Sequence, residues 1–249
     1  MRSWPRGYGR RVLEEVDSTN AEAARIAPDL AGPEWILALR QTAGRGRRGR
    51  VWIEPEGNFA ATLVMRPPGD PETVALRSFV AALAVYDAVV AVTGRTAGMT
   101  LKWPNDVLLN GGKLAGILLE SSGQAGGLSH LAIGIGVNLA GVPGAHEVEK
   151  DAFRPVSLLS ESGVRVMPGE FLDALAPAYA EHEVLFATYG FAPIRRAWLE
   201  RAAKLGLEIT ARTATETTTG QFETVDAGGN LVLSTPGGRH VIRAAEVFF

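Results

Sequence analysis

The longest apolar stretch of the chain constrains its fold most. It runs from Val74 to Val92, and Arg77 and Asp87 lie inside it. The larger apolar residues that recur there at helical spacing are Leu76, Phe79, Val80, Leu83 and Val90. Charged residues disfavour a continuous membrane span, because an ionised group inside the bilayer is costly. The pattern therefore predicts a helix buried in the core of a globular domain.

Length and composition narrow the classes further. At about 150 residues per domain, 249 residues favour one large domain with a small companion. Lys and Arg total 25 against 27 Asp and Glu, so the net charge of −2 argues against binding nucleic acid through bulk charge. The absence of cysteine excludes disulfides, thiolate metal sites and cysteine nucleophiles. The basic N-terminus leads into acidic residues instead of the apolar segment of a signal peptide, so we expect a cytoplasmic protein.

Strand and helix patterns alternate along the first 205 residues, which predicts an α+β domain with a mixed sheet. Strands are predicted over 12–16, 35–40, 58–65, 100–103, 107–109, 113–120 and 128–139, and helices over 19–26, 74–92, 157–160, 170–189 and 193–204. Thr19 and Glu22 have the spacing of a capping box, and Asp70 precedes a proline suited to a first helical turn. Asn110-Gly111 predicts a tight turn.

The pattern of secondary-structure signals changes at Gly206. Short alternating strands follow, separated by Thr-rich and Gly-Gly turns, as in small barrels. We therefore expect a catalytic or binding domain over residues 1–205 and a small β domain over 206–249.

An arginine-rich loop, GRGRRGR from Gly44 to Arg50, is the most unusual segment. Glycines allow close backbone approach and arginine forks match phosphate or carboxylate oxygens, so the loop can wrap a polyanion. A solvated basic loop or an arginine-rich RNA contact explains the same residues. The loop also satisfies G-x-G-x-x-G, but no helix pattern follows it, so we do not interpret it as a dinucleotide fingerprint.

A second constellation surrounds the predicted hairpin. Lys102-Trp103-Pro104-Asn105-Asp106 brings a cation and oxygen-bearing side chains to a strand end, which is also what an ordinary turn contains. The hairpin returns Lys113 to the neighbourhood of Asn105 and Asp106, so a cation and a carboxylate become neighbours. The glycines of GIGVN (134–138) either relieve packing or let a flat ligand lie on the backbone. Asp17-Ser18-Thr19-Asn20 either caps a helix or binds a small polar ligand.

These motifs occur together as DSTN, QTAGRGRRGRVW, KWPNDV, KLAGILLE and GIGVN, over residues 12 to 139. The set resembles the biotin protein ligases. The resemblance implies a catalytic domain like that of class II aminoacyl-tRNA synthetases and a small C-terminal SH3-like β-barrel. It implies an enzyme that joins biotin to ATP, giving biotinyl-5′-adenylate and pyrophosphate. The biotin then passes to a lysine of a biotin carboxyl carrier domain of acetyl-CoA carboxylase or a related carboxylase.

The resemblance also implies site residues. The catalytic residues would be Lys113, Arg47 and Asp106. The biotin-binding residues would be Ser18, Thr19, Asn20, Gln41, Gly44, Arg45, Arg47, Lys113 and Gly116. The residues binding ATP or the adenylate would be Arg45, Arg47, Arg48, Arg50, Trp52, Asn105, Asp106, Lys113 and Asn138. Ser18, Thr19 and Gln41 would contact the ureido ring, Trp52 would cover the adenine, and Asn138 would contact its edge. Mg²⁺ would arrive on the ATP phosphates, without a metal site made by protein alone.

Alternatives remain at this stage. A lipoate or octanoate ligase shares the fold and the adenylation logic, and a non-enzymatic RNA-binding module is supported by the arginine-rich loop alone. The catalytic pattern begins by Val12, so we expect the ligase-only form, which lacks the DNA-binding domain of many relatives. We expect neither DNA nor a membrane as a partner.

Overall fold

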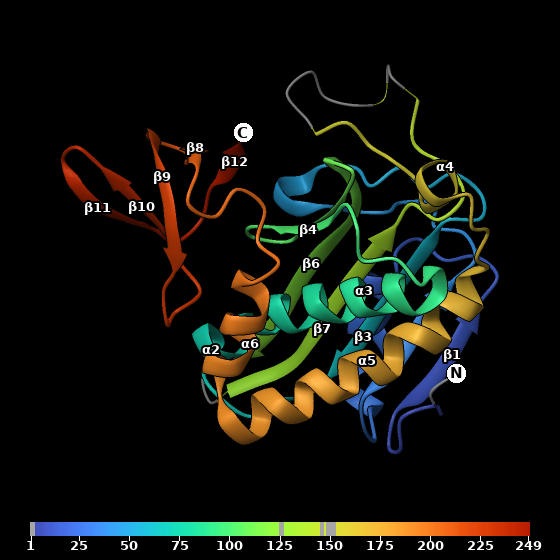
Figure 1. The fold of residues 1–249 in the computed structure, drawn as a ribbon. Helices are drawn as coiled ribbons and strands as arrows, with labels where there is room; N and C mark the ends of the chain where they lie inside the picture. The colour runs from blue at the N-terminus through green and yellow to red at the C-terminus, as the bar shows by residue number, and fades with distance from the viewer. Residues whose placement is uncertain (1–2, 125–126, 145–146, 148–152) are drawn as a thin grey trace.

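The structure, a computed structural model, describes residues 3–124, 127–144, 147 and 153–249. A seven-stranded sheet flanked by helices forms the larger part, and a five-stranded antiparallel sheet near the C-terminus forms the smaller part (Figure 1). The predicted α+β class with a small C-terminal β domain is confirmed.

The large sheet is mixed. Its strands are β1 (Gly9–Leu13), β2 (Glu34–Ala38), β3 (Phe59–Met65), β4 (Met99–Lys102), β5 (Asp106–Leu109), β6 (Gly112–Gln124) and β7 (Gly127–Val137). They pair in the order β1-β2-β3-β7-β6-β5-β4, with β1 and β2 parallel and the other neighbours antiparallel. The predicted turn between β5 and β6 is present, with φ of 49° at Asn110 and 76° at Gly111.

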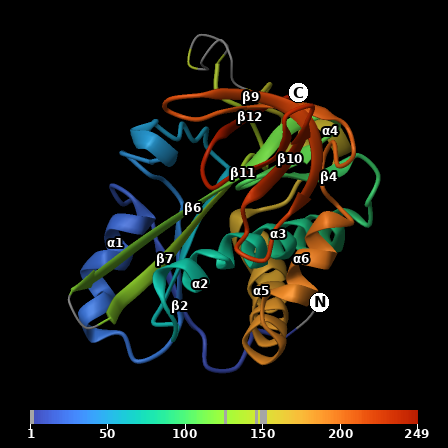
Figure 2. The same ribbon diagram turned by 90° about the vertical axis from the view of Figure 1, so that its left-hand side faces the viewer.

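Helices cover the two faces of this sheet unequally. They are α1 (Thr19–Ile26), α2 (Pro71–Ala75), α3 (Arg77–Thr93), α4 (Leu158–Ser162), α5 (Pro168–Tyr189) and α6 (Phe191–Leu199), with short 3₁₀ turns at Ala27–Asp29 and Arg47–Gly49. The long helices α3 and α5 pack together against one face, and α1 lies on the other side of β6 and β7 (Figure 2). Because α1 is short, part of its face of the sheet is left for other groups.

The apolar stretch forms the predicted core helix. By length and composition Pro71–Thr93 could cross a membrane, but 67% of its most apolar window is buried inside the structure. Arg77 is buried there because Glu183 of α5 binds its guanidinium at 2.7 Å. The helix is split at Leu76 into α2 and α3, unlike the single predicted helix, and Asp70 caps α2 by accepting from the Thr73 backbone N–H.

The C-terminal sheet contains β8 (Glu208–Arg212), β9 (Thr217–Val225), β10 (Leu231–Thr235), β11 (Gly238–Ile242) and β12 (Glu246–Phe248), paired in the order β11-β10-β9-β8-β12. It contacts the larger part at specific points. The Trp103 indole N–H donates to the Gly229 carbonyl, and the Arg195 guanidinium donates to the Val225 carbonyl. The first contact places this sheet beside the KWPND segment.

Other local predictions are wrong as well, and the helix predicted over 193–204 ends at Leu199. The expected capping box at Thr19 and Glu22 is absent, since the N-cap residue is Ser18 and its side chain makes no capping bond. The Thr19 hydroxyl donates to Gln41 instead, so a tertiary contact replaces the local one. The strand predicted over 12–16 ends at Leu13, and Val16 forms only an isolated bridge with Gln41.

Candidate functional site

A cavity of about 450 Å³ lies on the α1 face of the large sheet, beyond the N-terminus of α1. The small residues of its floor come from strand positions that point to this face. Gly136 pairs with Ala60 on one side and Gly116 on the other, and Gly134 pairs with Thr62 and Leu118. Neighbouring positions such as Ile135 belong to the opposite, apolar core. Glycine and alanine therefore leave room above the strands for a flat group.

Side chains already lie close to these glycines. A Cβ on Gly136 would come within 2.5 Å of the Trp52 ring, and one on Gly116 within 3.2 Å of it. A Cβ on Gly134 would lie 2.4 Å from the Asn20 amide oxygen. In this structure the GIGVN glycines make room for the side chains of Trp52 and Asn20, which is the packing alternative, and a flat ligand on the backbone stays a prediction.

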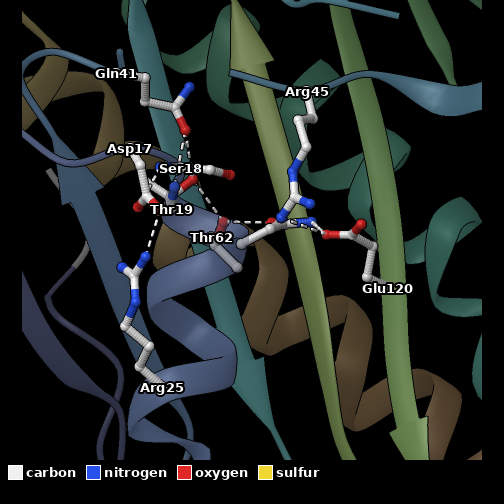
Figure 3. A network of polar contacts seen from close by, with 9 residues as sticks. Asp17, Ser18, Thr19, Arg25, Gln41, Arg45, Thr62 and Glu120 are labelled. Atoms are coloured by element: carbon white, nitrogen blue, oxygen red, sulfur yellow. Dashed lines mark hydrogen bonds and ion pairs between the residues drawn. The ribbon is translucent and has the colours of Figure 1, made fainter. Parts of the chain in front are cut away.

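One end of the cavity is a network of uncharged hydrogen-bonding side chains, bordered by the ion pairs of Arg25 with Asp17 and of Arg45 with Glu120 (Figure 3). Gln41 Oε1 accepts from the Thr19 backbone N–H at 2.9 Å and from Thr19 Oγ1 at 3.1 Å. Thr62 Oγ1 lies 2.7 Å from Thr19 Oγ1 and 2.6 Å from the Asn20 amide oxygen. Asn20 donates in turn to Glu120 at 2.7 Å. Side by side, these donors and acceptors can match a polar ring that carries both N–H and carbonyl groups.

The other end of the cavity is charged. Lys113 Nζ lies 2.7 Å from Asp106 Oδ1, and Lys102 Nζ lies 3.5 Å from Asp106 Oδ2. Burial raises the pKa of the Asp106 carboxyl, but the two ammonium groups outweigh burial and hold that pKa below its usual value. Burial lowers the pKa of Lys102, and Asp106 opposes this. The predicted approach of Lys113 to Asp106 is therefore present.

The arginine-rich loop closes over the charged end. Arg47 donates to the Asn105 amide oxygen at 3.2 Å, and Asn105 donates to the Ile117 carbonyl at 2.6 Å. Burial lowers the pKa of Arg47. Glu246 of the C-terminal sheet accepts two hydrogen bonds from Arg50, at 2.6 and 3.1 Å. The C-terminal sheet thus holds the loop at the cavity.

The cavity brings together nearly all the predicted site residues. Those that line it are Ser18, Thr19, Asn20, Gln41, Arg45, Arg47, Arg48, Arg50, Trp52, Asn105, Asp106, Lys113, Gly116 and Asn138. Gly44 does not line it. Its carbonyl accepts from the Trp52 N–H at 2.9 Å, and an added Cβ would meet the Trp52 carbonyl oxygen at 2.6 Å. Gly44 therefore permits close pairing of the two sides of the loop.

Asn138 lines the cavity, but its side-chain amide is engaged in hydrogen bonds within the protein. Its side chain is buried, and its amide N–H donates to the Val156 carbonyl at 3.1 Å while its oxygen faces Asn58 at 3.4 Å. These bonds hold the chain that follows β7 to the segment before α4 and to Asn58, which precedes β3. Contact with an adenine edge through this amide stays a prediction.

Sequence reasoning missed several residues of the site. Lys102 was part of a noted motif but not of the predicted site, although it is 5% exposed and paired with Asp106. Phe153 lines the cavity, and Lys102 Nζ lies 4.5 Å from the centre of its ring. Glu54 binds Gln41 from outside the cavity lining, and Glu246 is 196 residues from its partner Arg50. Only Lys102 carried a local signal, the charge inside KWPND.

Comparison with known proteins agrees with this geometry. Residues 12–138 match the model of the biotin/lipoate A/B protein ligase family, and residues 204–249 match that of the biotin protein ligase C-terminal domain. The chain belongs to the biotin protein ligase family. An ATP-dependent ligase activity follows from this membership. The match to the C-terminal domain model also separates the chain from the lipoate ligases, which the catalytic-domain model covers as well.

Individual relatives of this ligase cover nearly its whole length. A biotin–[acetyl-CoA-carboxylase] ligase from Paracoccus denitrificans is 59% identical over 96% of this chain and 99% of that protein. The bifunctional ligase/repressor BirA of Bacillus subtilis is 32% identical over 95% of this chain and 73% of its own length. The solved biotin protein ligase from Aquifex aeolicus in complex with biotin and ATP superposes with a TM-score of 0.82, at 26% identity, over 96% of this chain and 98% of that one.

Proposed function

We propose that the protein activates biotin with ATP and transfers it to a lysine of a biotin carboxyl carrier domain. The observation that carries the proposal is one cavity with two unlike ends. The Thr19 and Gln41 network offers an acceptor and a donor for a cyclic urea, and the cluster around Asp106 offers cations. The two ends of biotin match the two ends of the cavity, because its ureido ring is neutral and its carboxylate is anionic.

The charged end suits attack by a carboxylate on a phosphate. Both reactants are anions, so their charge must be neutralised before they can approach to reacting distance. A contact between unit charges at 4 Å contributes about 4 kcal/mol at an effective dielectric constant near 20. Arg47 binds Asn105 and Lys113 binds the neighbouring Asp106, which supports a shared role of the two cations in this task. We assign Lys113 to the carboxylate and α-phosphate, and Arg47 to retention of the adenylate.

Asp106 is better suited to orient groups than to remove protons. Its low pKa, caused by Lys113 and Lys102, makes it a weak base. We therefore propose that it holds the ammonium of Lys113 in place and orients the incoming acceptor lysine.

We propose that Mg²⁺ binds this site together with the nucleotide. Among the residues that the structure describes, no group of three or more His, Asp or Glu side chains could hold a metal ion, and both Asp106 oxygens face ammonium groups. Mg²⁺ prefers oxygen ligands and commonly binds through phosphates. Bound in this way, it would neutralise charge on the leaving pyrophosphate.

Exchange of pyrophosphate into ATP tests the first half-reaction without a carrier. We expect exchange that depends on biotin and is absent with lipoate or octanoate. Exchange with lipoate or octanoate but not with biotin would show that biotin is not the substrate. RNA binding without any ATP turnover would show that the protein is not this enzyme. Transfer is tested by mass spectrometry of a carrier domain and of its variant lacking the acceptor lysine. We propose the cytoplasm as the compartment, since both ATP and the carboxylases are found there.

A further inference from the structure

Glu54 lies directly behind the neutral end of the cavity. The arginine-rich loop returns alongside itself, because the Trp52 N–H donates to the Gly44 carbonyl and Arg45 forms a bridge with Val51. This pairing places Glu54 against Gln41, whose Nε2 donates to Glu54 Oε2 at 3.0 Å. Glu54 is therefore held at the point where the loop meets the polar network.

The carboxylate determines how the Gln41 amide is turned. Gln41 directs Nε2 toward Glu54 Oε2, and once Glu54 is ionised the carboxylate only accepts hydrogen bonds, which enforces this orientation. Gln41 Oε1 then faces the Thr19 backbone N–H and hydroxyl. In the opposite orientation two oxygens would face each other at Glu54 and two N–H groups at Thr19. The amide is therefore fixed from both sides, with its acceptor oxygen toward Thr19.

The position is unfavourable for a carboxylate that has no other purpose. Glu54 Oε1 is buried and lacks a hydrogen-bond partner among the described residues. Burial raises the pKa of Glu54 to about 7, and the Gln41 hydrogen bond only partly opposes this. A buried polar atom without a hydrogen-bond partner lowers the stability of the folded protein. Packing alone would be served better by an apolar side chain.

We propose that Glu54 is a positioning residue: by fixing the Gln41 amide it keeps Oε1 in place as an acceptor, and a substrate N–H group binds this oxygen by replacing the Thr19 hydroxyl. The identity of that substrate as biotin rests on the proposed function. The orientation of the amide does not, because the contacts that fix it belong to the protein. Substrates without an N–H group at this end, such as straight-chain acids, gain nothing from this arrangement.

Steady-state kinetics of pyrophosphate exchange test the role. Glu54→Leu and Glu54→Ala remove the acceptor but differ in volume, so both should raise KM for biotin about tenfold while kcat and KM for ATP stay within twofold. Glu54→Gln keeps an acceptor oxygen and should restore KM to within threefold of wild type. Glu56→Leu, at an exposed position two residues away, is the matched control and should have no effect.

A double-mutant cycle separates positioning from packing. In a Gln41→Leu background, Glu54→Ala should cost no more than a further twofold, since the residue acts through Gln41. A full tenfold cost in that background, or losses of kcat and ATP affinity as large as the change in KM for biotin, would overturn the proposal.

A spectroscopic measurement keeps this inference separate from the substrate. The Gln41 side-chain NH₂ signal, assigned by its loss in Gln41→Leu, should shift in Glu54→Ala and stay close to its wild-type position in Glu54→Gln, in protein without ligand. If this holds and biotin does not bind, the proposed function fails and the positioning role stands. If biotin is activated but the signal ignores Glu54→Ala, the positioning role fails alone.

Discussion

Ionisation of Glu54 should make the protein less stable as the pH rises from 5 to 8. Burial raises the pKa of Glu54 from 4.5 to about 7 in the folded state. The folded state therefore binds this proton more tightly than the unfolded chain, so the stabilisation is fully present below pH 4.5 and is lost as the pH rises through 7. The interval between the two pKa values corresponds to about 3 kcal/mol, of which about 2 to 3 kcal/mol falls between pH 5 and 8.

Urea unfolding of wild type and Glu54→Gln at pH 5, 6, 7 and 8 measures this effect. Other titrating groups are common to both proteins, so they cancel in the difference between the two free energies of unfolding. That difference should move by about 2 to 3 kcal/mol in favour of Glu54→Gln between pH 5 and 8. Parallel curves would show that Glu54 ionises as in the unfolded chain, which would refute the argument from burial.

Three further predictions concern the charged end. Lys113→Ala removes the ammonium group at 2.7 Å from Asp106 and should slow pyrophosphate exchange about a hundredfold, about 3 kcal/mol; near wild-type exchange would contradict its role. Arg47→Gly should let the adenylate escape, detected as biotin on lysines of a bystander protein, and an unchanged adenylate off-rate would argue against it. Glu246→Gln weakens the paired hydrogen bonds to Arg50, so calorimetry should show severalfold weaker ATP binding with unchanged biotin binding; equal losses for both ligands would indicate general damage.

The elements that depend on local pattern could be predicted from the sequence. The apolar spacing from Val74 to Val92 predicted a buried helix, and burial of α3 confirms it. Asn110-Gly111 predicted the turn that returns Lys113 to Asp106. The positive φ of both turn residues confirms this prediction. The break at Leu76 was not predictable in the same way, because the apolar pattern continues through it.

The contacts that complete the site depend on the tertiary fold. Glu246 contacts Arg50 only because the C-terminal sheet lies beside the loop, and no local sequence pattern around either residue predicts this contact. The residues around Glu54 form no recognisable motif. Glu54 reaches Gln41 because the Trp52 N–H pairs with the Gly44 carbonyl. The failed capping box at Thr19 has the same origin. Its hydroxyl had a local partner available, but the distant Gln41 binds it instead.

The two ends of the cavity use carboxylates in opposite environments. Lys113 and Lys102 keep the pKa of Asp106 low, whereas Glu54 is buried with an amide as its partner and its pKa rises to about 7. At pH 6 the charged end therefore keeps its anion while Glu54 is mostly protonated. A neutral Glu54 binds the Gln41 amide less strongly, because charge-assisted hydrogen bonds are about twice as strong as neutral ones. Moderate acid should accordingly raise KM for biotin before it alters the ion pairs of Asp106.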